Sequence, residues 1–157
     1  MTRAASGKRS PRWAFLEGLD VGSEGDPYLD RLRIFQTPWF GLMLHHIHRP
    51  DIDPDPHDHP WWFASLILAG GYTEHVYPDK REGSYWTRVR GRWSFRALRR
   101  REAHIITRID GPLWTLVVTG HRAGDWGFWR NGSFTPWQQY VNRKQELHGP
   151  GPDQPVA

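Results

Sequence analysis

The chain of 157 residues contains no cysteine. This absence excludes disulfide bonds, thiolate zinc sites and cysteine nucleophiles, so any bound metal must rely on nitrogen or oxygen donors from His, Asp or Glu. Lysine is scarce as well, and the lysines present are Lys8, Lys80 and Lys144. The net charge of +4 therefore comes almost wholly from arginine, whose planar guanidinium suits carboxylate and phosphate groups.

The sequence also lacks several motifs that define large functional classes. It has no Gly-rich phosphate loop, no dinucleotide-binding fingerprint and no serine nucleophile elbow. No apolar run approaches the length of a membrane span, and the segment from Met1 to Ala5 does not have the apolar centre of a signal peptide. We therefore expect a soluble, cytoplasmic protein that does not interact with a membrane.

Composition favours one β-rich domain. Aromatic residues make up 14% of the chain, and 16 glycines and 13 prolines interrupt it often, which suits short strands better than long helices. Residues 1–25 are rich in Gly, Ser and charge, and we interpret them as a flexible basic arm. Residues 26–148 are then the β-barrel domain, and 149–157 a disordered tail.

Short apolar segments separated by turn signals predict the strands. Gly70 and Gly71 predict a tight reversal that makes a hairpin of the segments on either side of them, and Asp110-Gly111-Pro112 predicts another turn. Thr135 is a candidate N-cap for a single helix. The predicted strands are 28–35, 39–48, 61–68, 72–77, 84–89, 93–98 (paired with 84–89), 103–108 and 113–119, and the predicted helix is 136–147. This pattern indicates an all-β sandwich or jelly-roll barrel with a short C-terminal helix.

The segment His57-Asp58-His59-Pro60 is the strongest candidate for a functional site. Alternate side chains of an extended backbone share a face, so His57 and His59 project together. A third imidazole from another strand, His104, would complete a metal site with positions open to substrate. The competing interpretation is that these histidines only form hydrogen bonds with buried backbone.

These residues resemble the cupin superfamily, and more locally a group of small, uncharacterised bacterial and phage cupin-like proteins. The resemblance covers roughly residues 28–145 and rests on the His-x-His pair, the apolar segment after it, Gly70 and the distant His104. It implies a single-domain jelly-roll barrel. The acidic residue of the first cupin motif is missing, because its position falls on Phe63 or Ala64.

Glu74 is the leading substitute for the missing acid. Tyr72 and Glu74 share one strand face, and inside the barrel Glu74 would ligate the metal, orient a histidine or act as a general base. We therefore predict Glu74 and Tyr72 as catalytic residues, with Trp62 and Phe63 shaping the pocket. The alternative is an exposed glutamate, or one paired with a nearby arginine.

Three functions remain open. The first is an enzyme: a three-histidine, dioxygenase-like cupin that holds Fe(II) by preference, or Zn(II), Mn(II) or Ni(II), and oxidises a small polar substrate. The missing acidic ligand favours the second, a non-catalytic module that binds a small molecule or sugar with structural metal or none. A homodimer is compatible with either.

The third function is association with nucleic acid. Arg88, Arg90 and Arg92 fall on one face of a predicted hairpin, among many tryptophans that would stack on bases. We expect instead that the aromatics fill the core and that the arginines solvate an outer face, which makes nucleic acid an unlikely partner.

Three further histidines, His45, His46 and His48, lie on one predicted strand. Side chains alternate between the two faces of a strand, so only His46 and His48 can act together. His48 reaches the candidate metal site only if its strand lines the barrel.

Overall fold

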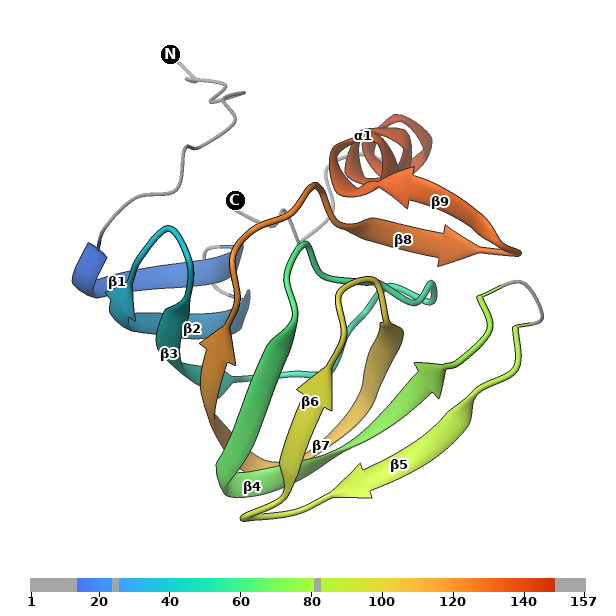
Figure 1. Ribbon diagram of the computed structural model, residues 1–157. Coiled ribbons are helices and arrows are strands. Elements are labelled where there is room, and N and C mark those ends of the chain that lie inside the picture. Colours follow the sequence, from blue (N-terminus) through green and yellow to red (C-terminus); the bar gives the residue numbers. More distant parts are fainter. Residues whose placement is uncertain (1–13, 24–25, 81–82, 149–157) are drawn as a thin grey trace.

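The computed structural model describes residues 14–23, 26–80 and 83–148. Within these residues the chain forms nine strands and one helix, in the order shown in Figure 1. Their bounds are β1 Ala14–Ser23, β2 Asp26–Gln36, β3 Gly41–Ile47, β4 Phe63–Tyr77, β5 Trp86–Arg90, β6 Phe95–Leu98, β7 Ala103–Thr119, β8 Gly127–Arg130, β9 Ser133–Pro136 and α1 Trp137–His148. The prediction of an all-β domain with a C-terminal helix is confirmed.

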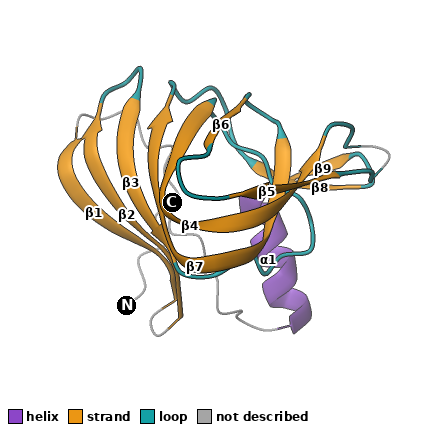
Figure 2. Cartoon of the chain, turned by 90° about the horizontal axis from the view of Figure 1, so that it is seen from below, coloured by secondary structure: helices purple, strands orange, loops and turns teal. Residues whose placement is uncertain are grey.

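Most strands belong to one antiparallel sheet. Its strand order is β1-β2-β3-β7-β4-β5, and β6 also pairs with β4. Seen from below in Figure 2, β1, β2 and β3 run side by side while β4 and β7 curve round to a second wall. Residues 113–119 lie in the middle of this sheet, because this part of β7 pairs with β3 on one side and β4 on the other.

The predicted hairpin at Gly70 and Gly71 is wrong. Residues 63–77 form one continuous strand that bends, with register shifts between Ile67 and Gly71. Gly70 has a φ of 72°, and a β-carbon there would overlap the carbonyl oxygen of Pro112. The glycine therefore bends the strand and lets β7 approach closely, instead of reversing the chain.

The predicted turn at Asp110-Gly111-Pro112 is also wrong, because this segment too lies within one continuous, bent strand. Gly71 pairs with Asp110, so this segment lies opposite the bend of β4 inside the 17-residue strand β7. Gly111 has a φ of 73°. Two long neighbouring strands thus bend together, and this shared bend produces the two walls of the barrel.

The predicted pairing of residues 84–89 with 93–98 is also corrected. β5 pairs with residues 72–76 of β4, and β6 pairs with residues 63–66 of the same strand. Trp93 occupies the turn between them with a φ of 67°. β5 and β6 are therefore successive partners along one edge of β4.

The assignment of residues 14–23 to a flexible arm is wrong. Residues 14–23 form β1, which pairs with β2 from Ala14↔Gln36 to Ser23↔Asp26. The ladder of backbone hydrogen bonds with β2 supplies a partner that the weak local pattern did not indicate. Residues 1–13 and the predicted tail 149–157 lie outside the described residues.

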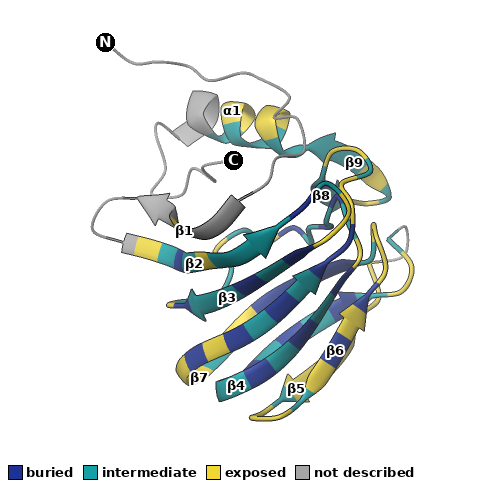
Figure 3. Ribbon diagram, turned by 60° about the vertical axis from the view of Figure 1, so that its left-hand side comes forward, coloured by how far each residue is buried: buried dark blue, intermediate teal, exposed yellow. Residues whose placement is uncertain are grey.

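The main core lies between the two walls. Buried and less buried residues alternate along β4 and the second half of β7, as the coloured bands in Figure 3 show. This is the period of two expected of strands with one inward face. The buried residues of the main cluster are Leu29, Ile47, Ile67, Tyr72, Ile106 and Leu113, and a second cluster contains Phe63, Leu98 and Val117.

The helix α1 begins one residue after its predicted start and contacts the β8-β9 hairpin. The Trp137 ring stacks on Trp126 at 5.9 Å, and the Tyr140 ring stacks on Phe128 at 3.9 Å. These aromatic pairs attach the helix to the outside of the barrel. Among the described residues, no helix has both the length and the hydropathy that a membrane span requires.

Candidate metal centre

His57, His59 and His104 meet in the folded chain, although 45 residues separate the last two. The backbone groups of His57 and His104 form a reciprocal pair of hydrogen bonds, with N–O distances of 3.1 and 3.0 Å. The loop that carries His57 is therefore fixed against β7. His59 follows two residues later and its ring reaches the same point, which confirms the predicted meeting of the three side chains.

The donor atoms of these histidines have a spacing suited to a metal ion. One ring nitrogen from each histidine lies within 4.8 Å of the others, and His59 Nε2 is 3.0 Å from His104 Nε2. Nitrogens bound about 2.0–2.1 Å from one metal ion at angles of 90–110° are roughly 3.0–3.4 Å apart. The side chains present thus fit a divalent metal that prefers imidazole ligands, with no thiolate near.

Carboxylates lie on the far sides of two of these rings. His104 Nδ1 is 3.5 Å from Glu74 Oε2, and His57 Nδ1 is 3.9 Å from Asp51 Oδ2. Arg96 Nη1 lies 3.4 Å from the same His104 Nδ1, so this ring nitrogen has both an acid and a guanidinium beside it. When Nδ1 carries the proton, Nε2 is free to act as a ligand.

Asp51 is a residue that sequence reasoning missed. Its Oδ1 accepts a hydrogen bond from the Tyr28 hydroxyl and its Oδ2 accepts one from the Ile106 backbone amide, both at 2.7 Å. These bonds hold the start of the proline-rich loop against β7, two residues from His104. The only signal in the sequence was the density of aspartates in that loop, which does not single out one of them.

Burial keeps the imidazoles of His59 and His104 neutral. Burial is the largest cause that lowers the pKa of His59, followed by the charge of His57, and it places this pKa well below the ordinary value of 6.5. The pKa of His104 is also well below 6.5, through burial and then the charge of Arg96. A neutral imidazole has the free lone pair that a metal ligand needs.

Glu74 is fully buried, so the alternative of an exposed strand glutamate is wrong and the alternative of an arginine partner is confirmed. Its Oε1 accepts a hydrogen bond from Arg90 Nε at 2.5 Å, and its Oε2 lies 2.7 Å from Arg96 Nη1. Glu74 therefore contacts His104 on the Nδ1 side and lies outside the group of three donor nitrogens. This position fits the predicted orienting role better than direct ligation.

Tyr72 is buried on the same face of β4 as Glu74, as predicted. Burial raises the pKa of its phenol, and the nearby Arg96 charge opposes that rise. Phe63 is buried as well, and its ring centre is 4.8 Å from that of His59. Trp62 differs from the expectation: it is 47% exposed and lies against Gly120 instead of the centre.

Buried aspartates secure the loop that presents the histidines. Asp58 has no exposed surface, and it accepts hydrogen bonds from the Gly127 amide and from Trp129 Nε1, both at 3.0 Å. Asp55 accepts bonds from Arg130 and from the Tyr140 hydroxyl. These contacts tie the loop to β8 and α1.

A second group of potential metal ligands lies on the other face of β3. His46 and His48 act together as predicted, with Asp30 of β2 beside them and His48 Nε2 2.7 Å from Asp30 Oδ2. The ring of His46 stacks on Trp114 at 4.3 Å. His48 is exposed and takes part in this outer group, so it does not join His57, His59 and His104.

The predicted row of solvated arginines is corrected at Arg90. This side chain turns inward to Glu74, while Arg88 lies over the Trp86 ring and Arg92 Nε donates to the Leu68 carbonyl. The expectation that tryptophans fill the core is also wrong for several of them. The tryptophans among the exposed large side chains are Trp39, Trp62, Trp86, Trp93 and Trp114.

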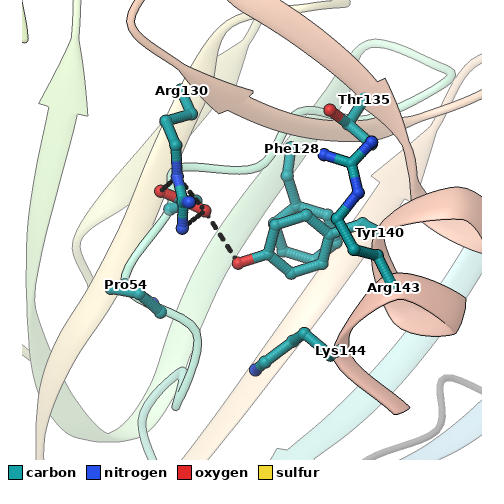
Figure 4. Close-up of a pocket in the computed structure, with 8 residues that line it drawn as sticks. Pro54, Phe128, Arg130, Thr135, Tyr140, Arg143 and Lys144 are labelled. Atoms are coloured by element: carbon teal, nitrogen blue, oxygen red, sulfur yellow. Dashed lines mark hydrogen bonds and ion pairs between the residues drawn. The ribbon is translucent and has the colours of Figure 1, made fainter. Parts of the chain in front are cut away.

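A cavity of about 260 Å³ lies outside the barrel, between the proline-rich loop and α1 (Figure 4). The Phe128 ring lies on its wall and also within 6.2 Å of the His57 ring. None of the three histidines lines this cavity. Its lining residues are Pro54, Asp55, Phe128, Arg130, Thr135, Tyr140, Arg143 and Lys144.

Comparison with protein-family models and with curated proteins finds no match. Solved structures do match. A putative mannose-6-phosphate isomerase from Ralstonia eutropha has a TM-score of 0.52 at 15% identity, over 62% of this chain and 88% of the other. Streptomyces PAC13 crystallised with uridine has a TM-score of 0.52 at 9% identity, over 81% and 94%. The Fe(II) form of HppE has a TM-score of 0.50 at 12% identity, over 66% and 56%.

These structures are cupin-fold proteins, and the chain therefore has the cupin fold. The identities are low, so the likeness concerns the arrangement of strands. Within that fold the chain carries three histidines that could bind a metal ion. The particular chemistry is argued below from its own residues.

Proposed function

We propose that this protein is a metal-dependent cupin enzyme that binds a divalent metal, Fe(II) by preference, through His57, His59 and His104 and oxidises a small polar substrate with dioxygen. The observation that carries the proposal is the convergence of three imidazoles, in which one ring nitrogen of each lies within 4.8 Å of the others and the Nδ1 atoms of His57 and His104 lie near carboxylates. Three imidazole ligands also suit Zn(II), Mn(II) and Ni(II). The Fe(II) form of one structural neighbour supports the choice of metal.

A bound metal of this kind supplies a Lewis acid and, as Fe(II), the electrons that dioxygen chemistry requires. The chain itself holds the ligands in place. Glu74 Oε2 lies 3.5 Å from His104 Nδ1, and Arg90 and Arg96 fix Glu74 from two directions. Phe63 presents an apolar ring to His59, which keeps water from one side of the site.

The second candidate is a barrel that binds a small molecule without chemistry. Phe63 favours it, because an apolar ring stands close to His59 where the resemblance places an acidic ligand. A site with only three neutral ligands holds a dication with less electrostatic help than one with a carboxylate. Both candidates use the same histidines, so the test must separate metal binding from access to the metal.

The first experiment measures metal content. Protein purified without a histidine tag is dialysed against Fe(II) under argon or against Zn(II), and the bound metal is counted by elemental analysis. We expect about one ion per chain in the wild type and a loss of that ion in both His57→Ala and His104→Ala. His121→Ala, which changes an exposed loop histidine, is the matched control and retains the ion.

The second experiment tests access. Nitric oxide is added to the Fe(II)-loaded protein as a surrogate for dioxygen, and the electron paramagnetic resonance spectrum is recorded. A high-spin iron–nitrosyl signal indicates an open position and supports the enzyme. Bound Fe(II) that gives no such signal rejects the enzyme and leaves the binding module. Metal content that neither histidine substitution changes rejects the metal-dependent enzyme and leaves a binding module without metal at these histidines.

A further inference from the structure

The outward face of one wall of the barrel is apolar, although an antiparallel sheet usually presents polar side chains to water. This wall contains β2, β3, the second half of β7, the first half of β4, and β6, and its register arranges the outward side chains in rows across the strands. We call the surface of two neighbouring rows the apolar face, because every member is hydrophobic and none is buried. The first row is Leu32, Leu44, Leu116, Leu66 and Phe95, and the second is Phe35, Leu42, Val118, Ala64 and Ala97.

The members of these rows point away from the core. On β3 and β7 they alternate with buried residues such as Met43 and Val117. On β6, the Phe95 side chain is 65% exposed, whereas its neighbour Arg96 is 5% exposed. The helix α1 lies against β8 and β9, so within the part of the chain that the structure describes it leaves the apolar face uncovered (Figure 1).

Two strands of this wall have sequences typical of strands that are covered on both sides. Residues 63–68 and 113–119 carry apolar side chains at inward and outward positions alike. The inward side chains enter the core, but the outward ones form a contiguous exposed patch. With strands ~4.8 Å apart and alternate residues ~6.8 Å apart, the two rows cover roughly 300 Å² in projection. Patches of several hundred Å² mark interaction sites in soluble proteins.

Aromatic side chains around the two rows enlarge this patch. Trp114 lies on the same side of β7 as Leu116 and is 37% exposed, and the Phe40 ring packs edge-on against Phe35 at 4.9 Å. Protruding side chains have more accessible surface than their projection, so the patch approaches the roughly 800 Å² per partner that a standard protein interface buries. The apolar face is therefore large enough for a stable contact with another protein chain.

The order of the strands suits a second copy of this chain as the partner. β7 is the middle one of the five strands that form the rows, and its row member Leu116 lies between Leu44 of β3 and Leu66 of β4. A twofold axis along β7 would place Leu116 of one copy against Leu116 of the other. The same axis would place Leu32 of each copy against Phe95 of the other. A self-complementary contact of this kind closes after two copies.

The two edges of the apolar face carry opposite charges. Asp30 lies on the same side of β2 as Leu32, and its side chain is 47% exposed. Arg92 lies at the opposite edge, where its Nε donates a hydrogen bond of 3.0 Å to the Leu68 carbonyl of β4. The twofold axis along β7 brings the Asp30 edge of one copy over the Arg92 edge of the other. Two complementary charge contacts would thus form on the rim of the interface, where water still reaches them.

We propose that two copies of this protein form a symmetric dimer by packing their apolar faces together, with β7 of each copy along the twofold axis. The facing sheets lie about 10 Å apart in such a contact, as the two sheets of a β-sandwich do. The two rows hold no charge, so burying them leaves no unpaired charged group in the centre of the interface. The contact requires neither the metal nor the substrate of the proposed function.

Sedimentation equilibrium of the full chain tests the proposal, and we expect the mass of two chains for the wild type. Leu116→Glu should weaken dimerisation by about 100-fold or more, because it places two carboxylates against each other in the centre of the interface. Phe95→Glu should weaken it by about tenfold or more. Because Phe95 is mostly exposed in the single chain, this variant decides the question if Leu116→Glu does not fold. Val89→Glu, which changes a 77% exposed residue of β5 outside the apolar face, is the matched control and stays dimeric.

Charge reversal tests the twofold arrangement. Asp30→Arg and Arg92→Asp should each weaken the dimer by about threefold to tenfold at low salt, because rim charges contribute modestly and are screened. The double variant exchanges the two charges and should recover most of the lost affinity.

Three results would overturn the proposal. A wild-type chain that stays monomeric at high micromolar concentration assigns the apolar face to another occupant. A dimer that survives both Leu116→Glu and Phe95→Glu uses a different surface. A double charge reversal that associates no more tightly than either single variant rejects the twofold axis along β7. Circular dichroism and metal content are recorded for each variant, so that loss of the dimer is distinguished from unfolding and from loss of the proposed metal site.

Discussion

The two histidine groups of this protein contain similar residues in opposite environments. The inner group of His57, His59 and His104 lies inside the barrel, and its carboxylate neighbour Glu74 is fully buried. The outer group of Asp30, His46 and His48 lies on the far face of β3, where Asp30 has 47% of its side chain exposed. Similar residue types and short distances therefore occur twice in one domain.

The difference between the groups is in what surrounds the ligands. In the inner group, carboxylates lie near the Nδ1 atoms of His57 and His104, and the Nε2 atoms of His59 and His104 are 3.0 Å apart. In the outer group Asp30 Oδ2 already contacts His48 Nε2, and water competes for every partner. Burial and a second layer of partners, more than the presence of histidines, distinguish a prepared site from a polar surface.

The largest effect is expected at the buried carboxylate. Glu74→Gln leaves Arg96 buried beside a neutral amide, and an uncompensated buried charge typically costs about 3–5 kcal/mol of folding free energy. Asp30→Asn in the outer group should cost less than about 1 kcal/mol, because its histidine partners are solvated. Urea unfolding followed by tryptophan fluorescence measures both changes.

A double variant, Glu74→Gln with Arg96→Met, is the control for this comparison. It removes the unpaired charge and should recover part of the lost stability. If Glu74→Gln and Asp30→Asn have equal effects on the free energy of unfolding, the two groups do not differ in the way that their burial indicates.

The next largest effect concerns metal affinity. His59→Ala removes one of three inner ligands and should weaken Zn(II) binding by about 100-fold or more, since loss of an outer-layer partner alone costs about 10–100-fold. His48→Ala removes a ligand of the outer group and should leave the tightest binding step unchanged. Competition with a fluorescent zinc chelator gives the Zn(II) dissociation constant of each variant. A larger loss of Zn(II) affinity in His48→Ala than in His59→Ala would make the outer group the main metal site.

The sequence predicted the chemistry of the inner group better than its surroundings. His57 and His59 alternate on one short segment and His104 is an isolated strand histidine, so their meeting followed from the period of a strand and the resemblance. The position of Glu74 on the inward face followed from the same alternation with Tyr72. The arginine partners of Glu74 could not be predicted in this way. Arg90 and Arg96 reach Glu74 only through the register of β5 and β6 along β4.

The fold class was predictable, but the path of the chain was less so. Gly70 and Gly111 are equally good signals for a reversal and for a bend, and only the pairing of β4 with β7 over both halves selects the bend. Arg31 shows the same limit. Nothing local distinguishes it from a solvated arginine, because its inward direction is set by the register of β2 with β3.

The smallest expected effect is the pH dependence of folding stability that buried histidines cause. Burial, followed by the charge of Arg31, lowers the pKa of His45 well below 6.5, and burial likewise lowers the pKa values of His59 and His104. These groups are neutral in the folded protein, whereas the unfolded chain binds protons below about pH 6.5. The unfolded state then holds more protons, so stability is complete above that pH and falls as the pH decreases toward the folded pKa values.

Each such histidine contributes a slope of about 1.4 kcal/mol per pH unit within that window. His45→Gln keeps an acceptor for Arg31 Nε but cannot take up a proton, so the decline in stability between pH 6 and pH 5 should be shallower by up to that amount. Urea unfolding at pH 8 separates the packing effect of the substitution, because the proton contribution there is equal for both proteins. An unchanged slope in His45→Gln would mean that His45 takes up a proton in the folded barrel as readily as in the unfolded chain, which would contradict the lowered pKa of its imidazole.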